Sequence, residues 1–196
     1  EAFRDVALML RAAVHAHSWR NPASGSEYDY AMHAVVHPQA KKCGAVDRSV
    51  LLQDLGYDVA LQEGPLTRES LSKSKYLREH VGQDAGAGEL ADLIALHAYE
   101  LEEYDAVALV DHDTLILGPV DEAVDLIVDS RREGEGTSIQ AVFAWEHLPS
   151  LADPGARVAV VNLSFFLLRP SKRTFADLVA RYRDAPFSEG RGWGSL

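Results

Sequence analysis

Helical segments alternate with short apolar strands along this chain, and that order constrains the fold more than any other feature of the sequence. Apolar residues recur at helical spacing over residues 2–18. Continuous apolar runs occur later in the chain, and the clearest are AVALVD at 106–111 and VAVVNLSFFLLRP at 158–170. Such strands, separated by helices, are typical of sheets that are covered on both faces. The pattern therefore predicts an α/β fold with a Rossmann-like, mostly parallel sheet and helices on both faces.

The individual elements are predicted from apolar spacing and from the turn residues between them. Helices are expected over 2–18, 47–55, 89–104, 119–132 and 171–184, and strands over 31–38, 57–62, 106–111, 138–145 and 158–170. Gly56 is expected to end the second helix, and Ser171 is expected to cap the last one. The chain opens inside a helical pattern and closes on a Gly-rich stretch, so we expect a single truncated domain over 1–196.

Composition and charge exclude several classes of protein. The 196 residues are 47% apolar and 25% charged, which is ordinary for a globular chain and sufficient for one domain with a sizeable core. The net charge of −11 argues against a nucleic-acid partner, because such surfaces need an excess of Lys and Arg. No apolar run approaches the ~20 residues that span a bilayer, so we expect no membrane segment in this chain. The single cysteine, Cys43, excludes an intramolecular disulfide.

Two acidic residues, Asp111 and Asp113, stand directly after the apolar strand predicted at 106–111. Ligands gather at the carboxyl ends of strands in α/β sheets. Two ionised carboxylates about 5 Å apart repel each other by roughly 3 kcal/mol at an effective dielectric of ~20. A bound cation removes this cost, and oxygen ligands favour Mg²⁺ or Mn²⁺. The pair therefore indicates a metal site whose open positions suit substrate phosphates.

Two other interpretations of the same pair remain open. Asp is common at chain reversals, so Asp111 and Asp113 can be turn residues that precede Gly118 and Pro119. The pair also resembles the Asp-x-Asp start of haloacid-dehalogenase-type phosphatases. In that chemistry a threonine stands at the fifth position, whereas Thr114 stands at the fourth position here.

The surrounding sequence resembles the family 8 glycosyltransferases, of the glycogenin and galactinol-synthase type. That family carries a tyrosine, an apolar strand, Asp-x-Asp-Thr-Leu-x-Leu and a turn with Asp-Glu into a helix, and this chain has EYDAVALVDHDTLILGPVDE. The preceding ALHAYELEEY is similar to the family's KLxxWxLxxY. Downstream, VNLSFFLLRPSKRTFADLV is similar to the family's Asn-x-Gly strand and the helix after it. The resemblance covers residues 12–185 in order.

This resemblance implies a GT-A nucleotide-sugar fold and a retaining hexosyltransferase. It implies that Asp111 and Asp113 hold Mn²⁺ (or Mg²⁺), which clamps the diphosphate of a UDP-sugar donor. Asn162 matches the family Asn that lies near the donor sugar or the acceptor. The acceptor would be a carbohydrate, a polyol or a protein. Family members occur in the cytoplasm and in the Golgi, so the resemblance does not select a compartment.

The sequence also departs from the family in ways that favour a second hypothesis. Ala95 stands where the family has a lysine near the donor phosphate, and Ser164 replaces the Gly of Asn-x-Gly. The family's late metal-binding His and phosphate-binding Lys are expected beyond residue 196. These departures favour the alternative of a non-catalytic relative that binds a nucleotide or a partner without turnover.

Overall fold

A computed structural model describes residues 2–18, 20, 23, 25–44, 46–67, 70, 92–111, 114–132, 141–149 and 157–184, and only the backbone of residues 43, 92, 130–132, 143–149 and 157–164 among them. The described elements form a mixed α/β fold with a small parallel sheet, which confirms the α/β class. The chain divides into two compact units, one made of 1–32 with 103–170 and the other of 33–102 with 171–196. No helix in the described ranges is long and apolar enough to cross a membrane.

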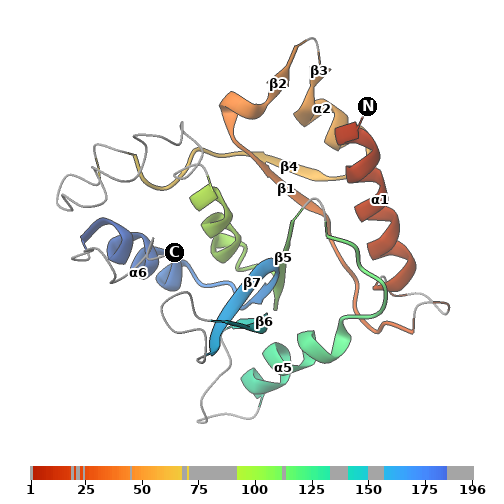
Figure 1. Cartoon of the computed structure of the whole chain (residues 1–196). Helices are drawn as coiled ribbons and strands as arrows, with labels where there is room; N and C mark the ends of the chain where they lie inside the picture. Colours follow the sequence, from red (N-terminus) through yellow and green to blue (C-terminus); the bar gives the residue numbers. More distant parts are fainter. Residues whose placement is uncertain are drawn as a thin grey trace. The chain divides into compact units, whose positions relative to one another are not determined.

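The described residues of the first unit form a three-stranded sheet and two helices, which can be followed in Figure 1. Its elements are α1 (Ala2–His17), β5 (Val107–Val110), α5 (Asp121–Arg132), β6 (Ala141–Pro149) and β7 (Arg157–Leu168). The strand order is β5-β7-β6, and β7 is antiparallel to both of its neighbours. β5 and β6 therefore run in the same direction, and α5 is the helix between them along the chain.

Helix α5 packs one apolar face against the centre of this sheet. Val124 and Ile127 are three residues apart, which places them on the same face of the helix. They form a buried cluster with Leu167 of β7, and Ile127 has none of its surface exposed. Partly buried residues surround the cluster: Tyr28, Ala106, Ala108, Val120, Ala123, Val128, Val142 and Phe165. This contact fixes α5 on β7, and the pairing of β5 with β7 fixes the residues before the segment that joins β5 to α5.

Strand β7 is irregular next to Asn162. Phe143 of β6 pairs with Phe166, whereas the next residue, Ala144, pairs with Asn162. Residues 163–165 therefore have no partner on β6, although Phe165 pairs with Val110 on the β5 side. Such irregularities bend a strand and redirect its side chains. The irregularity lies at the end of the short β5–β7 ladder.

In its described residues, the second unit contains a parallel pair of strands, a short hairpin, two α-helices and two 3₁₀ helices, and its labelled elements can be followed in Figure 1. Its elements are β1 (His33–Val36), η1 (Pro38–Ala40), β2 (Lys42–Cys43), β3 (Val46–Asp47), α2 (Arg48–Asp54), β4 (Asp58–Leu61), η3 (Asp92–Glu100) and α6 (Lys172–Asp184). β1 and β4 pair in parallel, and β2 pairs with β3 in an antiparallel hairpin. The connection from β1 to β4 includes α2, as a parallel pair requires a crossover.

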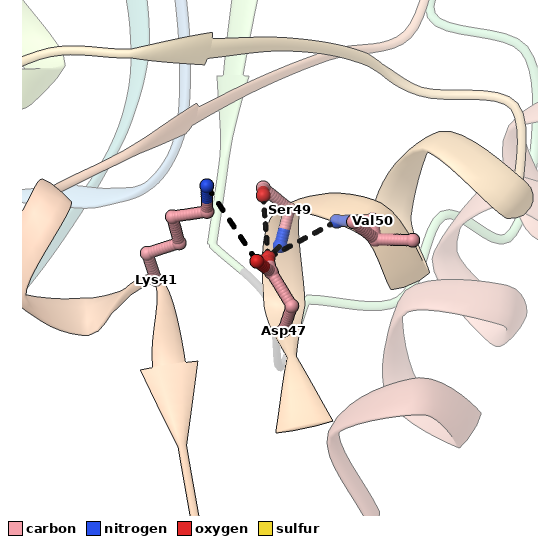
Figure 2. A network of polar contacts seen from close by, with 4 residues as sticks. All are labelled: Lys41, Asp47, Ser49 and Val50. Carbon is pink, nitrogen blue, oxygen red and sulfur yellow. Dashed lines mark hydrogen bonds and ion pairs between the residues drawn. The ribbon is translucent and has the colours of Figure 1, made fainter. Parts of the chain in front are cut away.

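Both ends of helix α2 are capped by hydrogen bonds from the residues that flank it. At its start, Oδ1 of Asp47 accepts hydrogen bonds from the Ser49 amide at 3.0 Å, the Ser49 hydroxyl at 2.5 Å and the Val50 amide at 3.3 Å (Figure 2). Lys41 Nζ lies 3.5 Å from the other oxygen, Oδ2. The Ser49 hydroxyl is the main cause that lowers the pKa of Asp47. The first turn of α2 therefore has an acceptor for its otherwise unpaired amides.

The end of α2 confirms the predicted role of Gly56. Gly56 has φ = 84°, a backbone conformation that L side chains rarely adopt. Its amide donates to the Gln53 carbonyl at 2.8 Å, and the Tyr57 amide donates to the Leu52 carbonyl at 3.0 Å. These two bonds form the Schellman arrangement, in which the residues around the reversal also make an apolar contact. Leu52 and Tyr57 are both buried, in agreement with that arrangement.

Most predicted elements within the described ranges agree with the structure to within a few residues, but two expectations need correction. Three of the four described strand pairs are antiparallel, not mostly parallel. Only residues 150–156 join β6 to β7, and this segment is too short for the crossover of a dozen or more residues that a parallel pair needs. The helix expected over 89–104 is a 3₁₀ helix over Asp92–Glu100 where the chain is described.

Candidate functional site

Asp111 directly follows β5, as the sequence predicted, and it is exposed to solvent. The amide of Thr114 donates to the Asp111 carbonyl at 3.0 Å, so the chain turns directly after the strand. His112 and Asp113 lie outside the described residues. Asp111 is therefore the described carboxylate of the predicted pair, and it is accessible to a ligand from solvent.

Asn162 belongs to β7, where its backbone pairs with Ala144 of β6, and its side chain lies outside the described part of the structure. Val110, the last residue of β5, pairs with Phe165. Because the two strands are antiparallel, the chain that leaves β5 at Asp111 heads toward the part of β7 that contains Asn162. The strand pairing thus brings Asp111 and Asn162 to the same end of the β5–β7 ladder.

The segment between β5 and α5, residues 111–120, is held near its end by residues from the other part of the same unit. The Ser18 hydroxyl donates to the Gly118 carbonyl at 3.5 Å. At the first residue of α5, Asp121 Oδ1 accepts from the Ser26 hydroxyl and Oδ2 accepts from the Glu27 amide, each at 2.8 Å. We call residues 111–120 the acidic loop. The structure thus joins its end to residues that lie 94 to 100 positions earlier in the chain.

A further contact continues this attachment along α5. The Tyr28 hydroxyl donates to Asp125 Oδ1 at 2.5 Å, about one helical turn beyond Asp121. The Tyr28 amide donates to the Ser26 hydroxyl oxygen at 3.3 Å. Ser26 therefore accepts one hydrogen bond and donates its own hydrogen to Asp121, so that its hydroxyl is oriented by both partners.

Several polar side chains around the Ser26–Asp121 contact are buried. Ser18 and Ser26 are both buried, with 1% and 6% of their surface exposed. The Tyr30 hydroxyl is also buried, and it has no hydrogen-bond partner among the described residues. Burial raises the pKa of Tyr30, and the negative charge of Asp121 raises it further. The cluster is a low-dielectric environment in which the Ser26–Asp121 hydrogen bond is stronger than at an open surface.

The sequence did not single out Asp121 or Ser26. Asp121 lies inside the quoted motif EYDAVALVDHDTLILGPVDE, but its position there suggested only the start of a helix. Its partners, Ser26 and Glu27, are 95 and 94 positions away. A serine followed by two acidic residues and two tyrosines has no local pattern that predicts such a partner. Only the folded first unit identifies this pair.

The second unit has its own polar junction around His97. The ring nitrogen Nδ1 of His97 contacts the Glu100 carboxylate, and Nε2 lies 3.0 Å from the Glu63 carbonyl oxygen. The ring also lies against Phe175 of α6, with 5.4 Å between the ring centroids. A 3₁₀ helix aligns residues three apart, which explains why His97 and Glu100 meet. These contacts join η3 to the segment after β4 and to α6, and we assign this junction a structural role.

The fit of a divalent cation to the predicted site depends on the chemistry of its donors. Across the described ranges, no group of three or more His, Cys, Asp and Glu side chains is arranged to hold a metal ion. Cations such as Mg²⁺ are, however, often held by one or two carboxylates together with substrate phosphates and water. Asp111 and Asp113 supply donors of that kind. Donors of this type suit a cation that binds together with a phosphate ligand, rather than one enclosed by protein groups alone.

Comparison of the chain with protein-family models and with curated proteins found no match. The resemblance to the family 8 glycosyltransferases therefore rests on the residues and motifs of the sequence itself. The activity, the donor and the metal that this resemblance implies are proposals.

Proposed function

We propose that this chain is part of a metal-dependent glycosyltransferase of the family 8 type, with a GT-A fold. In this proposal it transfers a hexose from a UDP-sugar to a carbohydrate, polyol or protein acceptor, with retention of configuration. Asp111 and Asp113 would hold Mn²⁺ or Mg²⁺, and Asn162 would contact the donor sugar or the acceptor. When bound, the cation would neutralise charge that develops on the UDP leaving group.

The position of Asp111 is the observation that carries this proposal. Asp111 is exposed directly after β5, and the strand pairing places it at the same end of the β5–β7 ladder as Asn162. The two motif regions that are 51 positions apart in the sequence therefore converge in space. Exposure leaves the Asp111 carboxylate free of the cost of burying an unpaired charge, and available to a cation and its phosphate ligand.

The chain's own residues would act mainly by orienting the donor. Asp111 and Asp113 would hold a cation, and the cation would supply the positive charge that binds the donor diphosphate. A polar side chain at Asn162 could then hydrogen-bond a sugar hydroxyl. Correct orientation of this kind contributes a large part of the rate enhancement of many transferases. No side chain in the described ranges is assigned as a nucleophile or general base.

Calorimetric titration of UDP into the 196-residue chain, with and without Mn²⁺, tests the proposal. We expect Mn²⁺ to tighten UDP binding by at least about tenfold, or about 1.4 kcal/mol, in the wild type. Asp111→Asn and Asp113→Asn should each abolish this Mn²⁺ dependence. Asp5→Asn is the matched control, because Asp5 is an exposed carboxylate on α1 far along the chain from the motif. Equal UDP affinity with and without Mn²⁺ in the wild type would refute the metal site.

A non-catalytic nucleotide- or partner-binding protein is the second candidate function, and Ala95 favours it. Ala95 is exposed on η3, at the position where the resemblance would place a phosphate-binding lysine. An alanine methyl group offers no positive charge to a phosphate. UDP-sugar turnover separates the two candidates. Mn²⁺-dependent UDP binding together with Mn²⁺-dependent hydrolysis or transfer supports the enzyme, whereas the same binding without turnover supports the non-catalytic protein.

A further inference from the structure

In its described part, residues 111 and 114–120, the acidic loop has little apolar packing before its last residue. Within the Thr114–Leu117 stretch, Ile116 is buried, whereas Leu115 and Leu117 are 57% and 76% exposed. Asp111, at the beginning of the loop, is exposed as well. Apart from Ile116, the apolar attachment of these residues is at the end of the loop, where Val120 packs against the core cluster. The course of the loop therefore depends strongly on what holds its end.

The end of the loop is held by polar contacts of good geometry. Asp121 uses both carboxylate oxygens, with the Ser26 hydroxyl and the Glu27 amide each at 2.8 Å. Hydrogen bonds to an ionised acceptor are roughly twice as strong as those between neutral groups. Asp121 also lies in the first turn of α5, where the helix dipole favours a negative charge. The Ser18–Gly118 contact adds a second attachment within the loop itself.

We propose that Asp121, held by Ser26 and Glu27, is a positioning residue that fixes the course of the acidic loop and, through it, the placement of Asp111. Asp121 does not touch the donor in this proposal. Its two carboxylate oxygens instead accept hydrogen bonds from Ser26 and Glu27. The consequence for UDP binding rests on the proposed function, whereas the fixing of the loop does not.

Amide hydrogen exchange at Thr114 tests the fixing directly in the full chain. The Thr114 amide donates to the Asp111 carbonyl, so its exchange rate reports how firmly the first turn of the loop is held. We expect Ser26→Ala and Asp121→Asn to accelerate this exchange by about tenfold or more, because each removes a charge-assisted hydrogen bond. Ser26→Thr keeps the hydroxyl and should restore slow exchange.

Two control variants separate positioning from a general loss of stability. Tyr28→Phe removes the bond to Asp125 but keeps the ring, and it should leave Thr114 exchange unchanged. Ile127→Ala weakens the core without touching the anchor. Under conditions in which local opening controls exchange, Ile127→Ala should accelerate exchange of the Thr114 amide less than Ser26→Ala does. Unchanged Thr114 exchange in both Ser26→Ala and Asp121→Asn would overturn the proposal. An acceleration in Ile127→Ala equal to that in Ser26→Ala would overturn it as well.

The Mn²⁺-dependent titration of UDP is run on the same variants. If Asp121 positions the metal site, Ser26→Ala weakens Mn²⁺-dependent UDP binding by about tenfold while Tyr28→Phe does not. A wild type without any Mn²⁺ dependence would refute the proposed function. Thr114 exchange would still decide whether Asp121 fixes the loop. The proposed function and the positioning role of Asp121 are therefore refuted by different results.

Discussion

The Ser26 hydroxyl donates a hydrogen bond to Oδ1 of Asp121 across 2.8 Å, although 95 positions separate the two residues. Ser26 lies between α1 and β1, and Asp121 is the first residue of α5. The contact joins the beginning of the first unit to the end of the acidic loop. A segment without regular structure is thereby attached to the first turn of α5.

This pair should be energetically coupled. Ser26→Ala leaves the buried end of the contact without its donor, and we expect it to lower the free energy of unfolding by about 1–3 kcal/mol. Asp121→Asn should lower it by a similar amount, because the amide nitrogen that replaces one oxygen cannot accept from its donor. The double variant should lose less free energy of unfolding than the sum of the two single losses, with a coupling energy of about 0.5–3 kcal/mol. Urea denaturation of the four proteins measures this, and strict additivity would contradict it.

The core contact of α5 is predicted to be a main source of stability in the first unit. Ile127 has no exposed surface and packs with Val124 and Leu167. Ile127→Ala should lower the free energy of unfolding by about 2–5 kcal/mol, because it removes buried methyl groups and leaves a cavity. Leu126 is its neighbour on α5 and is 50% exposed. Leu126→Ala should change stability by about 0.5 kcal/mol or less. Similar losses in the two variants would show that α5 is not packed as described.

The cap of α6 gives a prediction for the second unit. Ser171 Oγ accepts from the Thr174 amide at 3.1 Å, and the Phe175 amide donates to the Ser171 carbonyl at 2.9 Å, as expected for a residue that begins a helix. Ser171→Ala should cost about 0.5–2 kcal/mol in thermal or urea unfolding, whereas Ser171→Asp should retain most of the stability. A loss in Ser171→Asp equal to that in Ser171→Ala would show that the side-chain oxygen does not cap α6.

Alkaline pH should weaken the fold through Tyr182. Burial raises the pKa of Tyr182 to about 12, above the value of about 10 for an unfolded tyrosine. The neutral phenol is therefore favoured in the folded chain, and its stabilising contribution is complete below pH 10 and lost as the pH rises through about 12. Partial exposure reduces this contribution to about 1 kcal/mol.

Urea unfolding at pH 9 and pH 11.5 tests the Tyr182 prediction. The wild type should lose more stability between these two values than Tyr182→Phe, which has no phenol to ionise. Other tyrosines contribute to the same pH range in both proteins, so the comparison isolates Tyr182. An identical pH dependence in the two proteins would argue against this role of Tyr182.

Local sequence features were sufficient for several parts of the fold. Apolar periodicity located α5, and the Gly56 and Ser171 caps were predicted from residue types that stabilise helix ends. The position of Asp111 after β5 was also predicted, because a continuous apolar run ends there. Asp113 lies outside the described residues, so its placement stays a prediction. Each successful inference concerns groups that are close along the chain.

The sequence by itself determined the α/β class, the helix caps and the acidic residue at a strand end, since each depends on the steric and hydrogen-bonding preferences of neighbouring residues. Only the tertiary structure decided that β7 lies between β5 and β6, and that Asp121 receives hydrogen bonds from Ser26 and Glu27. Strand neighbours and long-range hydrogen bonds join groups that are distant along the chain. Their free energy depends on how the whole unit packs, which leaves no signature in any short stretch of residues.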